Sequence, residues 1–169
     1  PKVMRRFYVG AINSAKDSIK LLNPYLTLTH SVKKAIKRAL KRGVKFEVML
    51  AEKSDIPLTP DCAFYNLHWM MKKGAEVWIF QGGFHHTKVI MVDGKFCTVG
   101  STNLDARSLR WDYEENAIII DKPTTHELST LFDRDKQRSF RLNRDNWKTW
   151  KSRGQRFKCW FAHLFATWL

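Results

Sequence analysis

The sequence predicts an α/β domain in which a mixed β-sheet is flanked by helices. Three observations predict it: amphipathic helical segments alternate with short apolar strands, glycines follow two of the helices, and an Asp-Gly turn joins two strands. Gly43 and Gly74 stand just after a helix, where a left-handed backbone conformation is common. Asp93-Gly94 is a dipeptide typical of tight hairpins. Helices that alternate with strands in this way pack on the faces of the sheet.

The expected elements follow one another in a regular order. Apolar residues at helical spacing or in β-branched runs define each of them. The expected helices cover residues 4–17, 31–42, 61–73 and 124–139, and the expected strands cover residues 18–22, 44–50, 75–80, 87–92, 95–99 and 116–120. The proline-containing segment 51–60 is expected to be a loop, and we find no internal repeat.

A composition shift near Phe140 divides the chain into a domain over residues 1–140 and a helical tail over residues 141–169. From residue 136 onward there are nine Lys or Arg, a single acidic residue and four of the seven tryptophans. If Gly154 fills one gap, the large apolar residues fall at helical spacing: Trp147, Trp150, Phe157, Phe161, Leu164 and Trp168. Trp with basic residues is typical of a helix on an anionic membrane. Packing on the protein's own surface, or on a missing second half, is an equal alternative.

The charge of the chain predicts an anionic partner. Thirty Lys or Arg against sixteen Asp or Glu give a formal net charge of +14, which suits acidic lipid or nucleic acid. The basic residues of the expected helix 31–42 are interpreted as a solvated helix face. Three cysteines without metal-type spacing predict reduced thiols, and no metal site is expected. The longest run with few polar residues, 160–169, is too short to span a bilayer.

The segment HTKVIMVDGKFCTVGSTN, which begins at His86, carries the residues that indicate chemistry. His86 and Lys88 are expected on one strand face, because alternate strand residues point the same way. If the Asp93-Gly94 turn pairs the residues on either side of it, His86 lies opposite Ser101. One end of the hairpin would then gather an imidazole, an ammonium and a hydroxyl, with the Asn103 amide just beyond.

This group of side chains suits attack on a phosphodiester. An imidazole can act as nucleophile or general base, and a phosphohistidine intermediate divides one difficult displacement into two easier ones. Lys88 and Asn103 would stabilise negative charge on the phosphoryl oxygens, and Ser101 could add a hydroxyl donor. Asp93 lies about 23 Å from His86 along an extended strand. We therefore interpret Asp93 as a turn former rather than a proton carrier.

The spacing His-x-Lys, four residues, Asp, six residues, Gly-Ser-x-Asn resembles the HKD motif of the phospholipase D superfamily at every defined position. The continuation NLDARS from Asn103 and YEEN from Tyr113 resembles the cardiolipin synthase branch. Similar residues upstream, such as Leu22-Asn23-Pro24-Tyr25, extend the resemblance over roughly residues 4–140. The resemblance implies the αβα sandwich of phospholipase D and a catalytic role for residues 1–140.

The resemblance also implies roles for five residues. His86 would be one of two active-site histidines, and Glu114 would hydrogen-bond its ring and fix its tautomer. Lys88 and Asn103 would hold the phosphate, and Ser101 would help to position it. The implied mechanism needs neither metal nor cofactor: one histidine forms a phosphatidyl-enzyme, while its counterpart protonates the leaving alcohol and then activates the incoming one.

Four further residues near the motif are judged individually. His85 is expected on the opposite strand face from the catalytic side chains, with a structural or lining role. Arg107 is expected to be structural, whereas Arg110 stays open between structure and binding of a second phosphate. Glu115 competes with Glu114 as the histidine partner, and only the family register favours Glu114.

The sequence holds one His-x-Lys pair, whereas the superfamily builds its site from two motifs. A second HKD half is therefore expected, either in a longer chain or in a homodimer partner. Cardiolipin synthases usually carry both motifs on one chain, after amino-terminal membrane segments. The resemblance thus implies a bacterial cell membrane as the location, and the basic flanks indicate its cytoplasmic side.

Three functions stay open. The leading one is a phosphatidyltransferase that makes cardiolipin from two phosphatidylglycerol molecules and releases glycerol, acting at a membrane surface. The second is a phosphodiesterase or nuclease that acts as a homodimer, for which the positive charge would serve equally well. The third is a non-catalytic fragment that binds anionic membranes. The NLDARS continuation and the basic, Trp-rich tail favour lipid over nucleic acid.

Overall fold

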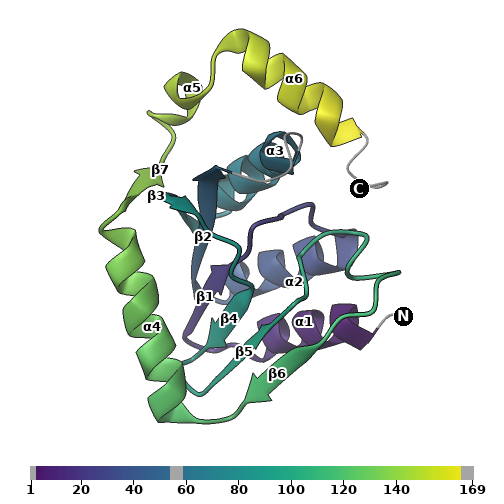
Figure 1. The fold of residues 1–169 in the computed structure, drawn as a ribbon, viewed down its shortest axis with the longest axis vertical. Coiled ribbons are helices and arrows are strands. Elements are labelled where there is room, and N and C mark those ends of the chain that lie inside the picture. Colours follow the sequence, from purple (N-terminus) through teal and green to yellow (C-terminus); the bar gives the residue numbers. More distant parts are fainter. Residues whose placement is uncertain (1–2, 54–58, 165–169) are drawn as a thin grey trace.

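The computed structural model describes residues 3–53 and 59–164 and contains the expected mixed sheet flanked by helices (Figure 1). Seven strands are arranged in the order β6-β5-β4-β1-β2-β3-β7. Their bounds are β1 Ser18–Leu22, β2 Lys45–Lys53, β3 Glu76–Phe84, β4 Val89–Val92, β5 Phe96–Gly100, β6 Asn116–Ile119 and β7 Ser139–Leu142. The central strands β1, β2 and β3 are parallel, and every other neighbouring pair is antiparallel.

Helices cover both faces of this sheet (Figure 1). Their bounds are α1 Val3–Ser14, α2 His30–Lys41, α3 Thr59–Lys72, α4 Lys122–Lys136, α5 Trp147–Trp150 and α6 Arg153–Leu164. Alternate strand residues point to opposite faces. Val48 and Leu50 therefore join the core under α1, α2 and α3, whereas Met49 between them joins a smaller core against Phe132 of α4. The result is a three-layer sandwich.

The Asp93-Gly94 turn forms as expected, but the pairing beyond it differs. Both residues have positive φ, 52° and 60°, and the Lys95 amide donates to the Val92 carbonyl at 2.9 Å. The strand ladder, however, pairs Val92 with Phe96. Lys95 is an additional residue on one side of the hairpin, so the register is shifted by one residue from the expected one.

Residues after α4 contact the rest of the domain. The last helix of the expected set ends at Lys136, and Ser139–Leu142 forms β7, a strand that the sequence analysis missed. The boundary expected between residues 140 and 141 falls inside this strand. Beyond it, Trp147 is buried and stacks on Phe64 and His68 of α3, with ring centroids 3.8 and 4.1 Å apart. Residues on both sides of the expected boundary thus share one core.

Two helices form where a single tail helix was expected. Lys151 has extended backbone angles and ends α5, and α6 then starts at Arg153. Cys159 of α6 is buried, whereas Phe157 and Trp160 are 67% and 48% exposed. One side of α6 therefore packs on the domain and another side is open. No helix within residues 3–53 and 59–164 has both the length and the apolar character needed to cross a bilayer.

Candidate active site

Asn23 connects the loop after β1 to the end of the motif. Its side chain is buried and its Nδ2 donates to the Thr102 carbonyl at 3.3 Å. Its Oδ1 accepts from the amides of Tyr25 and Leu104 at 3.2 and 3.1 Å. One buried amide thus satisfies three backbone groups from two segments far apart in sequence. This contact places the Tyr25 ring beside the motif.

His86 and Lys88 lie together at the open end of β4. Lys88 is 7% exposed, and its Nζ is 2.9 Å from each ring nitrogen of His86. The same Nζ donates to the His86 carbonyl at 2.9 Å. An ammonium can only donate, so a hydrogen bond between the two side chains requires a ring nitrogen of His86 that carries no proton. The Tyr25 ring meets His86 edge-on, with centroids 5.7 Å apart.

The prediction that His86 lies directly opposite Ser101 is wrong. Because Lys95 adds one residue to the hairpin, the Gly100 amide donates to the Lys88 carbonyl at 3.3 Å. Strand β4 begins only at Val89, so His86 stands before the paired part of the ladder. The backbone after β5 is nevertheless brought close to Lys88.

Ser101 is held by the segment that precedes β6. Its Oγ donates to the Glu114 carboxylate, and its amide donates to the Glu115 carbonyl at 2.9 Å. Of the two neighbouring glutamates, Glu114 therefore directs its carboxylate to the motif, while Glu115 contributes backbone. Gly100 makes this approach possible: a Cβ there would lie 2.2 Å from the Glu115 carbonyl oxygen.

A buried polar network beneath the motif was not foreseen from the sequence. The Thr102 hydroxyl donates to Asn116 Oδ1 at 2.5 Å, and Asn116 Nδ2 donates to Thr98 Oγ1 at 2.9 Å and to Tyr8 Oη at 3.3 Å. Burial raises the pKa of Tyr8 to about 12, so its hydroxyl stays neutral at physiological pH. The network joins α1, β5 and β6 behind the motif. The one signal in the sequence was Asn116, the last residue of YEEN.

Asn103, the last residue of the motif, has a buried Oδ1 without a hydrogen-bond partner in the described part of the chain. Leaving a buried acceptor unpaired costs about 1–3 kcal/mol. A side-chain amide carries donors as well as an acceptor, and a bound polar group would complete its hydrogen bonds.

Asp93 lies at the other end of β4, where it has a full set of partners. Its carboxylate accepts from the amides of Lys16, Asp17 and Ser18 at 2.9, 2.8 and 2.9 Å. Burial acts to raise the pKa of Asp93, but these hydrogen bonds outweigh burial, and its pKa is lowered from the ordinary value. Asp93 thereby attaches the hairpin turn to the start of β1, in addition to forming the turn.

The other candidates near the motif, His85, Arg107 and Arg110, have different surroundings. His85 pairs with Asp135 of α4 at 3.3 Å. Arg107 pairs with Asp112 at 3.1 Å, which agrees with a structural role. Arg110 has a buried Nε without a partner among the residues that the structure describes. Within these same residues, no three His, Cys, Asp or Glu side chains come together as metal ligands would.

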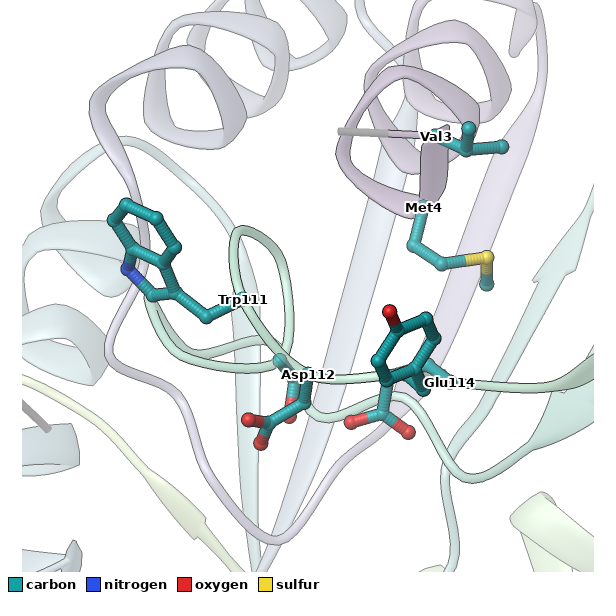
Figure 2. Close-up of a pocket in the computed structure, with 7 residues that line it drawn as sticks. Val3, Met4, Trp111, Asp112 and Glu114 are labelled. Atoms are coloured by element: carbon teal, nitrogen blue, oxygen red, sulfur yellow. The ribbon is translucent and has the colours of Figure 1, made fainter. Parts of the chain in front are cut away.

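A cavity of about 310 Å³ adjoins Glu114. Figure 2 shows Met4 reaching from the first turn of α1 toward the loop that carries Asp112 and Glu114, with Trp111 on the far side. The wall of the cavity combines two kinds of side chain. Val3, Met4, Trp111 and Tyr113 are apolar or aromatic, and Ser108, Asp112 and Glu114 are polar. Through Glu114, this cavity adjoins Ser101 of the motif.

With this geometry in view, comparison with known proteins decides the family. The model of the cardiolipin synthase phospholipase D-like domain matches residues 8–136. The chain belongs to this family. Its sequence is 34% identical over 159 residues to a cardiolipin synthase of Oceanobacillus iheyensis, covering 94% of this chain and 33% of that protein. It is 33% identical over 140 residues to a probable cardiolipin synthase, YwiE, of Bacillus subtilis, covering 83% of this chain and 28% of that one.

Solved structures of low sequence identity share the fold. Phosphatidylserine synthase of Haemophilus influenzae matches with a TM-score of 0.75 at 15% identity, covering 96% of this chain and 42% of that one. Nuc of Salmonella typhimurium, a phospholipase D family member, matches with a TM-score of 0.72 at 21% identity, covering 82% and 90%. The chain therefore spans about a third of the curated cardiolipin synthases but nearly all of a small member of the superfamily.

Proposed function

We propose that this chain supplies one catalytic half of a phosphatidyltransferase of the cardiolipin synthase type. The observation that carries the proposal is the His86–Lys88 pair, an exposed imidazole held beside a buried ammonium. Ser101 and Glu114 lie at the same end of the hairpin. The relatedness to cardiolipin synthases supports phosphatidylglycerol as the proposed substrate, with a second phosphatidylglycerol as the proposed acceptor.

The reaction would proceed in two displacements at phosphorus. In the first, one histidine of a pair forms a nitrogen–phosphorus bond, the bond to the glycerol oxygen breaks, and the other histidine gives that oxygen a proton. In the second, the latter histidine removes a proton from the acceptor hydroxyl, whose oxygen replaces the nitrogen. His86 is one member of this pair. Lys88 and Asn103 would hold the negatively charged phosphoryl oxygens throughout.

Glu114 and Ser101 would position these groups. We propose that the Glu114 carboxylate receives the ring N–H of His86 when the site is complete, which fixes the tautomer that leaves the reacting nitrogen free of a proton. The contact between Ser101 and Glu114 supports this proposal, because it already directs the carboxylate to the motif. Asp93 takes no part in proton transfer.

A second HKD half would complete the site. Large apolar side chains beside Glu114 support this proposal: Val3, Trp111 and Tyr113 are 72%, 76% and 105% exposed. Exposed aromatic residues are common at surfaces that another protein segment covers. The second half would come from the same polypeptide or from a second copy. We place the assembled enzyme at the cytoplasmic face of a bacterial membrane, where the open side of α6 and the positive charge of the chain would meet anionic lipid.

The test is product analysis by thin-layer chromatography after the protein is mixed with phosphatidylglycerol vesicles, with molar mass measured by light scattering. We expect cardiolipin and glycerol from the assembled form. A dimer mass would identify a second copy as the other half, and activity only in the longer polypeptide would identify a half in cis. His85→Ala serves as a matched control for His86→Ala. Cleavage of DNA without any reaction of phosphatidylglycerol would contradict the lipid assignment.

A further inference from the structure

A second cavity, of about 420 Å³, lies between α1, the start of α2 and the loop that follows the motif. Its wall includes apolar surface, with Val9 and the carbon atoms of longer side chains, and six residues with polar groups: Arg5, Arg6, Arg110, Thr29, Ser31 and His30. Among the described residues that line it there is no carboxylate. The wall therefore carries three positive charges without an internal counter-charge. His86, Lys88 and Asn103 do not belong to it.

Arg110 is the residue of this wall that most needs a partner. Its Nε is buried and has no acceptor among the residues that the structure describes. Arg107, three residues earlier in the same loop, is by contrast 71% exposed at its side chain and paired with Asp112. A buried donor without an acceptor lowers stability, and more so when it is charged. An anion inside the cavity would remove this cost.

The start of α2 adds backbone donors to the same cavity. Thr29 is the N-cap of this 12-residue helix, yet its side chain makes no capping hydrogen bond, and the first turn holds no acidic residue. The Thr29 hydroxyl lies instead 3.3 Å from the Ser31 hydroxyl. The first amides of a helix lack intrahelical acceptors and carry partial positive charge. Three residues at this helix start, Thr29, His30 and Ser31, line the same cavity as the three arginines.

We propose that this cavity binds a phosphate group. Arg110 would hold it with a two-pronged guanidinium contact, Arg5 and Arg6 would add charge, and the amides and hydroxyls at the start of α2 would complete the hydrogen bonds. Planar guanidinium groups match pairs of phosphate oxygens, and helix starts are favourable phosphate positions. The phosphate belongs either to an anionic lipid headgroup or to a soluble molecule, and it is separate from the phosphate that reacts at His86.

The test is ¹⁵N NMR of the arginine Nε–H groups of the protein, titrated with inorganic phosphate against sodium chloride of equal ionic strength. We expect the Arg110 signal to shift saturably with phosphate and the Arg107 signal to stay in place. Arg110→Met assigns the signal, and Arg107→Met is the control with the same loss of charge. The shift should persist in His86→Ala, which separates this site from the catalytic one. An Arg110 signal that does not move, or that moves no more than the Arg107 signal, would overturn the proposal.

Vesicle sedimentation distinguishes the two sources of phosphate. If a lipid headgroup occupies the cavity, Arg110→Met should reduce binding to phosphatidylglycerol vesicles at least about threefold more than Arg107→Met, and free phosphate should compete. If a soluble phosphate occupies it, the two variants should bind vesicles equally while the phosphate-dependent NMR shift remains in the wild type. Neither readout depends on turnover.

Discussion

The two ends of the motif hairpin differ in what their polar side chains contact. At the Asp93 end, one carboxylate accepts from three backbone amides, and its pKa is lowered. At the His86 end, an exposed imidazole meets the Lys88 ammonium, and the neighbouring Asn103 has a buried oxygen without a partner in the described chain. At the Asp93 end the carboxylate has its hydrogen-bond partners within the protein, whereas the polar groups at the His86 end can still bind a ligand. One sequence motif thus combines a structural end and a reactive end.

Replacing the imidazole should have the largest effect. We expect His86→Ala to lower turnover of the assembled enzyme at least about 10³-fold, because both displacements need this ring. The free energy of unfolding should change little, since His86 is exposed. Initial rates of cardiolipin formation and chemical denaturation measure the two quantities. His85→Ala, at the neighbouring residue bound to Asp135, should keep most of the activity.

Removal of the motif hydroxyl should have an intermediate effect. We expect Ser101→Ala to lower turnover about 10²-fold, because it removes a donor near the phosphate and releases the Glu114 carboxylate. The same rate assay, run over a range of substrate concentrations, separates positioning from binding. A change confined to KM would show that Ser101 only binds the substrate.

At the Asp93 end of the hairpin, a substitution should change the stability of the protein rather than its turnover. We expect Asp93→Asn to lower the free energy of unfolding by about 1–2 kcal/mol, because a neutral amide is a weaker acceptor for three backbone amides. Turnover per folded molecule should stay within about twofold of the wild type. Asp17→Asn, at an exposed neighbour, is the control for the loss of charge alone. Loss of turnover in a fully folded Asp93→Asn enzyme would refute the division between the two ends.

Lowering the pH should reduce the difference in stability between the wild type and Asp93→Asn. The pKa of Asp93 is lowered in the folded protein from 3.8. Its contribution to stability is therefore present above pH 3.8 and is lost as the pH falls through the lowered folded-state pKa. The gap in unfolding free energy between wild type and Asp93→Asn should narrow over this range, as denaturation at successive pH values can measure. A gap that widens in acid would contradict the assigned hydrogen bonds.

The elements of the sheet were largely predictable because their signals are local. Strand β1 was expected at its observed bounds, and Gly43 and Gly74 have φ of 86° and 102°, as a left-handed helix end requires. The first helix was also expected within a few residues. In each case the chain within one or two turns determines the conformation.

Features that depend on distant contacts were not predictable. Strand β7 follows a helix directly, and only its pairing with β3 makes it a strand. The extra residue at Lys95 follows from strand pairing beyond the turn, which the Asp93-Gly94 signal alone does not determine. Trp147 was expected on a tail helix, and its place against Phe64 depends on the tertiary fold.

The candidate site was predictable as a set of residues but not as an arrangement. Motif spacing singled out His86, Lys88, Ser101 and Asn103, and the structure brings their segments to one end of the sheet. The buried contacts that hold them there, from Asn23 and Asn116, join segments far apart in sequence. Hydrophobic periodicity and motif spacing do not predict contacts between segments that are far apart in the sequence.

The most direct test of the division between the two ends uses a soluble phosphodiester, bis(p-nitrophenyl) phosphate, which reports phosphoryl chemistry without a lipid acceptor. Release of p-nitrophenol is measured for the assembled wild-type enzyme, His86→Ala and Asp93→Asn, each normalised to its folded fraction. The account predicts that Asp93→Asn retains roughly wild-type rates and exceeds His86→Ala by at least about 10²-fold. Equal loss of activity in the two folded variants would contradict it.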